Sequence, residues 1–304
     1  MEYTVEVEFA PVYELISSIH TFLCKKSYKK IELGAAWAAE ASAGLSQQLL
    51  AGLEQVELDN DWKLLNLLIY LCPDKSTIEG VLEWLKGLAV GEMYEVLSEH
   101  VSVFPARMDE FREKMGCVLT EWHQQYFSGS SPAVLAGLQA HAEERRQQLQ
   151  SAASAADFVD ETTNGFVFMP EGLRKLVLIP QYHFQPVNII YNFGPLTLCH
   201  YASRMTIDDE ELSPFMVKTL RSLGEKSRLK ILKSLGQERK TFSEIVRSAG
   251  ISKGIVHDHI FSLRSAGLLH AYIEGENTTS YSLRLQGVHQ LNAQLLQYLG
   301  GEAE

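Results

Sequence analysis

Three segments in the last third of the chain decide the fold: Ser227-Arg-Leu-Lys-Ile-Leu-Lys-Ser-Leu235, Thr241-Phe-Ser-Glu-Ile-Val246 and Ile251-Ser-Lys-Gly-Ile-Val-His-Asp-His-Ile-Phe-Ser-Leu-Arg-Ser-Ala-Gly-Leu-Leu269. Their apolar residues have helical spacing, and short polar breaks separate the segments. Two β-rich stretches, 268–273 and 279–283, follow on either side of a Gly-containing turn. Three short helices and a hairpin predict a winged helix-turn-helix, a domain that places one helix in the major groove of DNA.

Local signals support this prediction. Thr241 and Glu244 have capping-box spacing, and Ser252 is a good N-cap for the next helix. In that helix Val256, Ile260 and Leu263 recur at helical spacing, so we expect them to pack inward.

The first turn of that helix offers amide donors and a positive dipole end to phosphates and base edges. His259, in the middle of this helix, has two possible roles: it contacts DNA, or it is a buried, hydrogen-bonded residue that steadies the helix. The predicted DNA-binding residues are Ser252, Lys253, Gly254, His257, Asp258, His259 and Arg264 on the helix, and Asn277 and Thr278 on the wing.

Residues 218–299 resemble the ArsR-like family of bacterial transcriptional regulators. The resemblance rests on Leu223-Gly-Glu-Lys-Ser-Arg-Leu-Lys-Ile-Leu232, on Ser252 with Val256-His-Asp-His-Ile260, and on Leu263-Arg-Ser-Ala-Gly-Leu268. It implies a homodimer that binds a short inverted repeat and usually represses a promoter. Such a dimer presents two recognition helices about one turn of DNA apart.

Two features depart from this pattern. Glu274 and Glu276 make the wing acidic, which disfavours contact between the wing and phosphate. Asp258 repels phosphate unless it orients a neighbour or accepts a hydrogen bond from a cytosine amino group.

The metal ligands that would make this segment a metal sensor are missing. Residues 242–248 contain no cysteine, and the C-terminal helix offers only His289. His257 and His259 lie two residues apart on a helix, so their rings point about 200° apart and cannot share one ion. We therefore expect no metal site. No Gly-rich phosphate loop, GxSxG or HExxH motif occurs, so we also expect no cofactor and no enzymatic activity.

Charge is unevenly distributed along the chain. Residues 1–212 carry 15 Lys and Arg against 30 Asp and Glu, whereas residues 213–304 carry 12 against 8. A basic C-terminal domain on an acidic body is what phosphate attraction requires. The chain has no run of eighteen apolar residues, its start is acidic, and its cysteines Cys24, Cys72, Cys117 and Cys199 are scattered. These features favour a cytoplasmic protein without a membrane span.

The remaining sequence predicts an α+β protein of two domains. Residues 1–212 should form a mainly helical domain that ends in a small antiparallel sheet, which the strand of residues 3–9 could join. Residues 213–304 should form the winged helix-turn-helix, and the acidic stretch Asp208–Pro214 is the predicted linker.

The first domain is expected to bind an effector, to dimerise, or both. If its strands pair, His183, Gln185, Cys199 and Tyr201 could converge on a small-molecule pocket; the alternative is that they are structural strand residues. The expected protein is a dimeric repressor that binds double-stranded DNA. The alternatives are a scaffold that uses the winged helix to bind another protein, and an enzyme with a regulatory DNA-binding tail.

Overall fold

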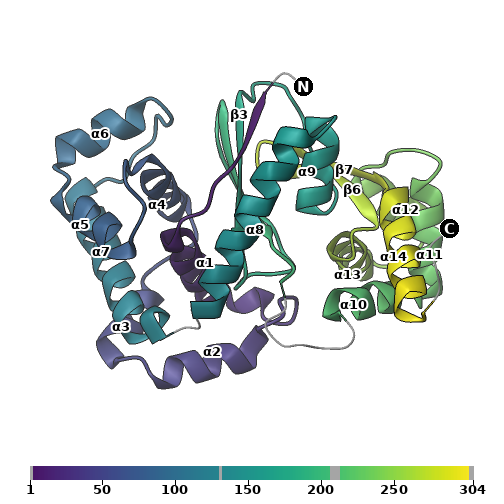
Figure 1. The fold of residues 1–304 in the computed structure, drawn as a ribbon, viewed down its shortest axis with the longest axis horizontal. Helices are drawn as coiled ribbons and strands as arrows, with labels where there is room; N and C mark the ends of the chain where they lie inside the picture. The colour runs from purple at the N-terminus through teal and green to yellow at the C-terminus, as the bar shows by residue number, and fades with distance from the viewer. Residues whose placement is uncertain (1–2, 130–131, 206–212, 301–304) are drawn as a thin grey trace. The chain divides into compact units, whose positions relative to one another are not determined.

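The computed structural model describes residues 3–129, 132–205 and 213–300, and the predicted mixture of helices and small sheets is confirmed (Figure 1). The helices are α1 (Pro11–Leu23), η1 (Lys25–Ser27), α2 (Gly34–Ala43), α3 (Gln47–Glu54), α4 (Asn60–Leu71), α5 (Ile78–Gly87), α6 (Val90–Ser98), α7 (Met108–Gln125), η2 (Phe127–Gly129), α8 (Pro132–Ser151), α9 (Ala155–Thr163), α10 (Pro214–Leu223), α11 (Lys226–Leu235), α12 (Phe242–Ala249), α13 (Lys253–Ser265) and α14 (Leu285–Tyr298). The strands are β1 (Thr4–Val7), β2 (Phe166–Phe168), β3 (Lys175–Gln181), β4 (Ile189–Phe193), β5 (Leu196–Ala202), β6 (Leu269–Glu274) and β7 (Asn277–Leu283).

The chain folds into two compact units that differ from the predicted division in one respect. The N-terminal unit comprises Tyr3–Arg146 and Gly172–Met205. The winged-helix unit comprises the C-terminal residues from 213 on together with Gln147–Glu171, which the prediction had placed in the first domain. The residues Asp208–Glu211 of the predicted linker lie outside the described part of the chain.

The sheet of the N-terminal unit is mixed, with the strand order β1-β3-β5-β4. The hairpin of β4 and β5 is antiparallel as expected, but β3 pairs parallel to both β1 and β5. The prediction of an antiparallel sheet is therefore wrong in this respect. The reason is topological, because β5 inserts between β3 and β4, so that consecutive strands β3 and β4 are not neighbours.

Helices cover both faces of this sheet. Helix α1 buries Val12, Leu15, Ile16 and Ile19 in a core that also contains the sheet residues Val177 and Leu198. Helix α8 runs across the other face (Figure 1). Its residue Arg146 donates a hydrogen bond to the carbonyl oxygen of Val7 at 2.9 Å. In the described part of the chain, no helix combines the length and hydropathy needed to span a membrane.

The winged-helix unit contains the predicted three helices and hairpin and one additional strand. Strands β6 and β7 form the antiparallel wing, while β2, about a hundred residues earlier in the chain, pairs parallel to β6 with Phe166 opposite Ala271. Helix α9 leads directly into β2. The segment 155–168 is thus part of the C-terminal fold.

A buried ion pair fastens this segment. The Arg284 side chain is 1% exposed, and its Nε lies 2.8 Å and 3.1 Å from the two carboxylate oxygens of Asp160 at the end of α9. One of its terminal nitrogens also donates to the carbonyl oxygen of Gly267 at 3.1 Å. His270 of β6 places its Nε2 3.1 Å from the same carboxylate. One acidic side chain therefore joins α9, the wing and the start of α14.

The backbones around this ion pair pack too closely for any side chain. Gly165 has φ +107°, and a Cβ there would lie 2.3 Å from the carbonyl oxygen of Leu269. A Cβ on Gly267, which has φ +68°, would lie 2.1 Å from the side-chain oxygen of Asn164. Both positions require glycine.

Removing one partner of the ion pair should destabilise the winged-helix unit strongly. Asp160→Ala leaves the Arg284 charge buried without its carboxylate, which typically costs about 3–5 kcal/mol. The loss should appear in urea unfolding followed by far-UV circular dichroism. The matched control is Asp109→Ala, which breaks the exposed pair of Arg107 and Asp109 and should cost much less.

The same loss should depend on pH. Burial alone would raise the pKa of Asp160, but the hydrogen bond from His270 and the charge of Arg284 outweigh it and hold that pKa below its ordinary value of 3.8. A carboxylate with a depressed folded-state pKa stabilises the fold above its ordinary pKa and loses this effect as the pH falls through the folded value. The difference in stability between wild type and Asp160→Asn should therefore be full at neutral pH and shrink below about pH 4. A difference that does not change with pH would contradict this role of the carboxylate.

Candidate nucleic-acid interface

The helix-turn-helix is formed by α12 and α13. The capping box predicted at the start of α12 is confirmed: Thr241 Oγ1 accepts from the Glu244 amide at 3.3 Å, and the Glu244 carboxylate accepts from the Thr241 amide at 2.8 Å. Helix α12 ends at Gly250 with φ +65°, and Ser252 Oγ caps α13 by accepting from the Ile255 amide at 3.4 Å. These caps fix a short turn between the two helices.

Helix α13 has one buried and one exposed face. Val256, Ile260 and Leu263 are buried, as their spacing predicted. The exposed residues lie in the first two turns and include most of the predicted contacts: Ser252, Lys253, Gly254, His257 and Asp258. The N-terminal half of α13 is therefore a polar surface that is accessible to a partner.

Ile255 belongs to this surface although the sequence analysis did not select it. Its side chain is 49% exposed, between the exposed residues Gly254 and His257. The signal was present in the sequence, because Ile255 does not fit the spacing of the inward residues Val256, Ile260 and Leu263.

The structure corrects the prediction that His259 contacts DNA. Its ring is buried against the start of α11, where Nε2 lies 3.1 Å from the Glu225 carboxylate and 3.0 Å from Ser227 Oγ. The hydrogen bond from Ser227 lowers the pKa of Glu225, which keeps this acceptor charged. His259 thus has the other role considered for it, a hydrogen-bonded residue that holds α13 against α11.

Arg264 also differs from its predicted place. Its guanidinium lies 5.7 Å from the ring centre of Phe166 on β2 and 5.8 Å from that of Phe261, and the residue is half-buried. Eleven residues separate it from Lys253, which corresponds to about 16 Å along a helix. Arg264 therefore packs at the far end of α13, away from the exposed surface of its first two turns.

The wing is a tight hairpin with an acidic tip. Glu274 pairs with Asn277 across a two-residue turn in which Gly275 has φ +60°. Asn277 is exposed and Thr278 is half-buried, and the acidic residues Glu274 and Glu276 are both exposed at the tip. The two predicted wing contacts thus lie beside carboxylates.

Exposed cations also lie on α11 and α12, the helices that precede α13. A hollow of about 430 Å³ lies between α11 and the turn before α13, and Lys226, Lys230 and Ile251 are among the residues that line it. Arg247 on α12 is also exposed. These side chains are additional candidates for phosphate contacts that the sequence analysis did not select.

The four candidate ligand residues of the N-terminal unit do not share one site. His183 is buried on the α1 side of the sheet, where its Nδ1 lies 2.5 Å from Glu14 and its Nε2 3.1 Å from the Tyr126 hydroxyl. On β5, His200 faces α1, since its Nδ1 lies 3.4 Å from Ser17 Oγ. Because side chains alternate along a strand, Cys199 and Tyr201 face the other way.

The two β5 residues lie against α8, where the Tyr201 ring centre is 5.8 Å from that of His141. Burial raises the pKa of the Cys199 thiol, which keeps it protonated. The Gln185 side chain is buried and donates to the carbonyl oxygen of Met205 at 3.0 Å. The predicted convergence of His183, Gln185, Cys199 and Tyr201 is therefore wrong, because the sheet separates them.

The structure also shows where the possible metal ligands lie. Within residues 3–129, 132–205 and 213–300, no three His, Cys, Asp or Glu side chains gather as a ligand set. On α13, His257 is exposed whereas His259 is buried, so the two rings lie on different faces.

Truncating the two histidines of α13 should affect stability to different extents. His259→Ala removes the hydrogen bonds between α13 and α11 and should cost about 1–3 kcal/mol, whereas His257→Ala should change stability little. Thermal and urea unfolding measure both. A His259→Ala variant that keeps its stability but loses binding to duplex DNA would place this ring on the DNA instead.

Comparison with known proteins identifies the same segment. Residues 225–271 match the family model described as bacterial regulatory protein, arsR family. A solved structure described as a possible transcriptional regulatory protein (fragment 1–100) from Mycobacterium bovis is 22% identical, with 29% of this chain and 92% of that chain covered and a TM-score of 0.23. No curated protein matches the sequence. The C-terminal part of this chain thus carries a helix-turn-helix that matches the arsR family of bacterial regulatory proteins.

Proposed function

We propose that this protein is a transcriptional repressor that binds an inverted repeat of double-stranded DNA as a homodimer. The observation that carries the proposal is the exposed, capped and polar N-terminal half of α13, inside the segment that matches the arsR family. In a helix-turn-helix this helix enters the major groove, and its first residues contact the base edges.

The chemistry of the exposed turns suits this position. Lys253 supplies a positive charge beside the amide donors of the helix N-terminus. A Cβ on Gly254 would meet no other atom within 4 Å, so this glycine is not needed for packing within the protein and leaves room for a close approach to DNA. Ile255 offers an apolar surface of the kind that contacts a thymine methyl group.

Phosphate contacts would come mainly from helices rather than from the wing. Lys226 and Lys230 border the hollow beside the helix-turn-helix, and Arg247 is exposed on α12. The wing tip carries Glu274 and Glu276, which repel phosphate, so the wing would contribute through Asn277 and Thr278 or remain outside the groove.

Dimerisation would use α14. Leu285, Val288 and Leu299 are 59%, 36% and 69% exposed, and at 100° per residue all three fall on one face of the helix. Exposed apolar side chains aligned on one face are typical of an interface. A twofold axis there would present two copies of α13 to successive major grooves, as an inverted repeat requires.

Repression would follow from occupancy of a promoter, and the N-terminal unit would supply the regulation. An effector changes DNA affinity only if it binds one state of the protein better than the other. We further propose that the protein acts in the cytoplasm and is not an enzyme, and that the arsR-type segment has no metal-sensing role.

Substitution of two exposed α13 residues tests DNA binding. Lys253→Ala combined with His257→Ala should weaken binding to a selected duplex by tenfold or more and leave the fold intact, since neither side chain is buried. The slope of log affinity against log salt should also fall in magnitude by about one unit. Fluorescence anisotropy measures both quantities.

The matched control is Lys86→Ala, which removes an exposed lysine of the N-terminal unit and should not affect DNA affinity. Unchanged affinity in the α13 variant would refute this placement of the recognition helix. If the wild type shows no salt-dependent binding to heparin or random duplex at low salt, the protein is instead a scaffold that uses its winged helix for another protein.

Charges on the apolar face of α14 should break the dimer. Leu285→Glu combined with Leu299→Glu places two carboxylates in the proposed interface, so sedimentation velocity should show a monomer where the wild type is a dimer. Gln286→Glu combined with Gln297→Glu, on the opposite face of α14, should remain dimeric. A monomeric wild type, or a dimeric Leu285→Glu and Leu299→Glu variant, would exclude α14 as the interface.

A further inference from the structure

A cavity of about 720 Å³ lies in the N-terminal unit between α2, α3 and the end of α1. It exists because the face of α2 that borders it carries only small side chains: Ala35, Ala38, Ala39 and Ser42, at the spacing of one helical face. Phe22 and the α3 residues Leu50 and Leu53 form the apolar wall opposite.

The size and lining of this cavity suit a small molecule. The cavity opens to solvent, since Ala35, Ala39 and Glu54 in its lining are exposed, so a small molecule can reach it. Ligand sites typically measure 300–1,000 Å³ and combine apolar walls with a few polar groups. Here the polar groups include Lys25, Tyr28 and Glu54.

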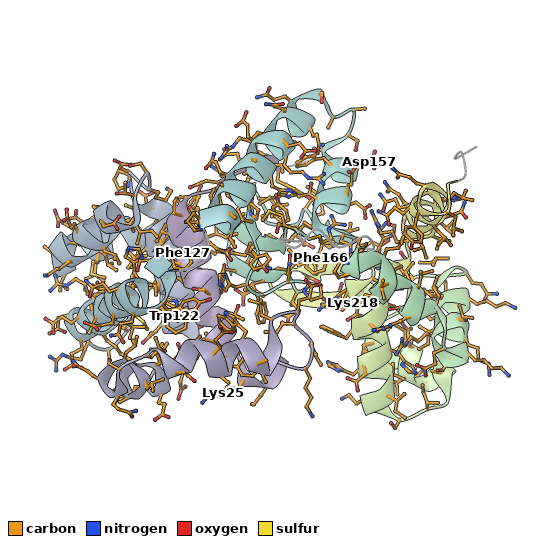
Figure 2. The ribbon with its side chains drawn as sticks, turned by 60° about the horizontal axis from the view of Figure 1, so that its bottom comes forward. Lys25, Trp122, Phe127, Asp157, Phe166 and Lys218 are labelled. Carbon is orange, nitrogen blue, oxygen red and sulfur yellow. The ribbon has the colours of Figure 1, made fainter. Side chains whose placement is uncertain are left out.

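The cavity borders a short segment that is rich in lysine. Lys25 lines the cavity, and Lys26, Lys29 and Lys30 follow within the same short segment, where no acidic residue intervenes. The N-terminal unit as a whole has 15 Lys and Arg against 21 Asp and Glu, so this segment opposes the charge of its surroundings. Figure 2 labels Lys25 beside the N-terminal helices, with its side chain at the surface.

We propose that this cavity binds a small amphipathic organic anion. Its apolar body would lie between α2 and α3, and its carboxylate, sulfonate or phosphate group would lie at Lys25. Glu54 also lines the cavity and would repel a second anionic group, which favours a ligand with one charged end. The proposal that an anion binds here rests on the cavity alone. The proposal that this anion is the effector of the repressor rests on the proposed function.

A chain of contacts connects the cavity to His183, one of the four candidate ligand residues. The Phe22 ring, which lines the cavity, lies 6.4 Å from the ring of Trp37 on α2. Trp37 Nε1 donates to the Tyr126 hydroxyl at 2.7 Å, and that hydroxyl lies 3.1 Å from His183 Nε2. His183 therefore lies behind the cavity rather than in it, and a ligand that moves α2 would change the surroundings of Trp37.

Three decyl compounds of different charge test the proposal with the full-length protein. Isothermal titration with decanoate, decanol and decyltrimethylammonium should show one saturable site that prefers the anion. Lys25→Glu should weaken decanoate binding by about fivefold, the upper range for an exposed charge pair. Lys86→Glu, an exposed lysine that does not line the cavity, is the charge-matched control and should bind as the wild type does.

A second pair of variants tests the location. Ala39→Trp fills the cavity and should abolish binding of decanoate, whereas Ala36→Trp, on an exposed position of α2 that does not line it, should not. 8-Anilinonaphthalene-1-sulfonate serves as an aromatic anion whose fluorescence reports binding. Decanoate should displace this dye from the wild type but not from Ala39→Trp. Equal affinity for all three decyl compounds, unchanged binding in Ala39→Trp, or no saturable binding of either anion would overturn the proposal.

The test of ligand binding is independent of the test of DNA binding, because binding to duplex DNA is measured without these compounds. Loss of ligand binding with intact DNA binding refutes only the cavity, and the reverse result refutes only the repressor.

Discussion

The buried ion pair between Asp160 and Arg284 is the constraint on which the C-terminal fold depends. It holds α9 and β2 against the wing although 124 residues separate its two partners. Desolvating an arginine and an aspartate is costly. The contact of His270 with the carboxylate, and the hydrogen bonds from Arg284 to the carbonyl oxygen of Gly267 and to Gln290 Oε1, offset part of this cost. The result is a winged helix whose sheet is extended by one strand, with Gly165 packed against the backbone of Leu269.

The contacts of α13 within the winged-helix unit determine which part of this helix is exposed. The C-terminal end of α13 is occupied, since Arg264 lies on the ring of Phe166, and the middle is held to α11 through His259. Only the first two turns remain exposed, with Lys253, Gly254, Ile255 and His257. A helix held at its far end and free at its N-terminus is the geometry that insertion into a major groove requires.

Local features were predictable from the sequence, and distant pairings were not. The capping box of Thr241, the cap at Ser252 and the inward face of α13 depend on residues within one or two helical turns, so their spacing identified them. The pairing of β2 with β6, the parallel strand β3 and the partner of Arg264 depend on segments far apart in the chain, for which periodicity carries no information. His259 shows the limit within one helix: spacing placed it near the boundary between the two faces, and only its partners on α11 show that it is buried.

The proposed function depends most directly on sequence-selective binding of DNA by the wild-type protein. Selection of bound duplexes from a random pool measures this without knowledge of the target. We predict enrichment of an inverted repeat whose half-sites are centred about one helical turn, or 10–10.5 base pairs, apart. Recovery of an unenriched pool, or of no duplex at all at low salt, would contradict the assignment of α13 as a recognition helix.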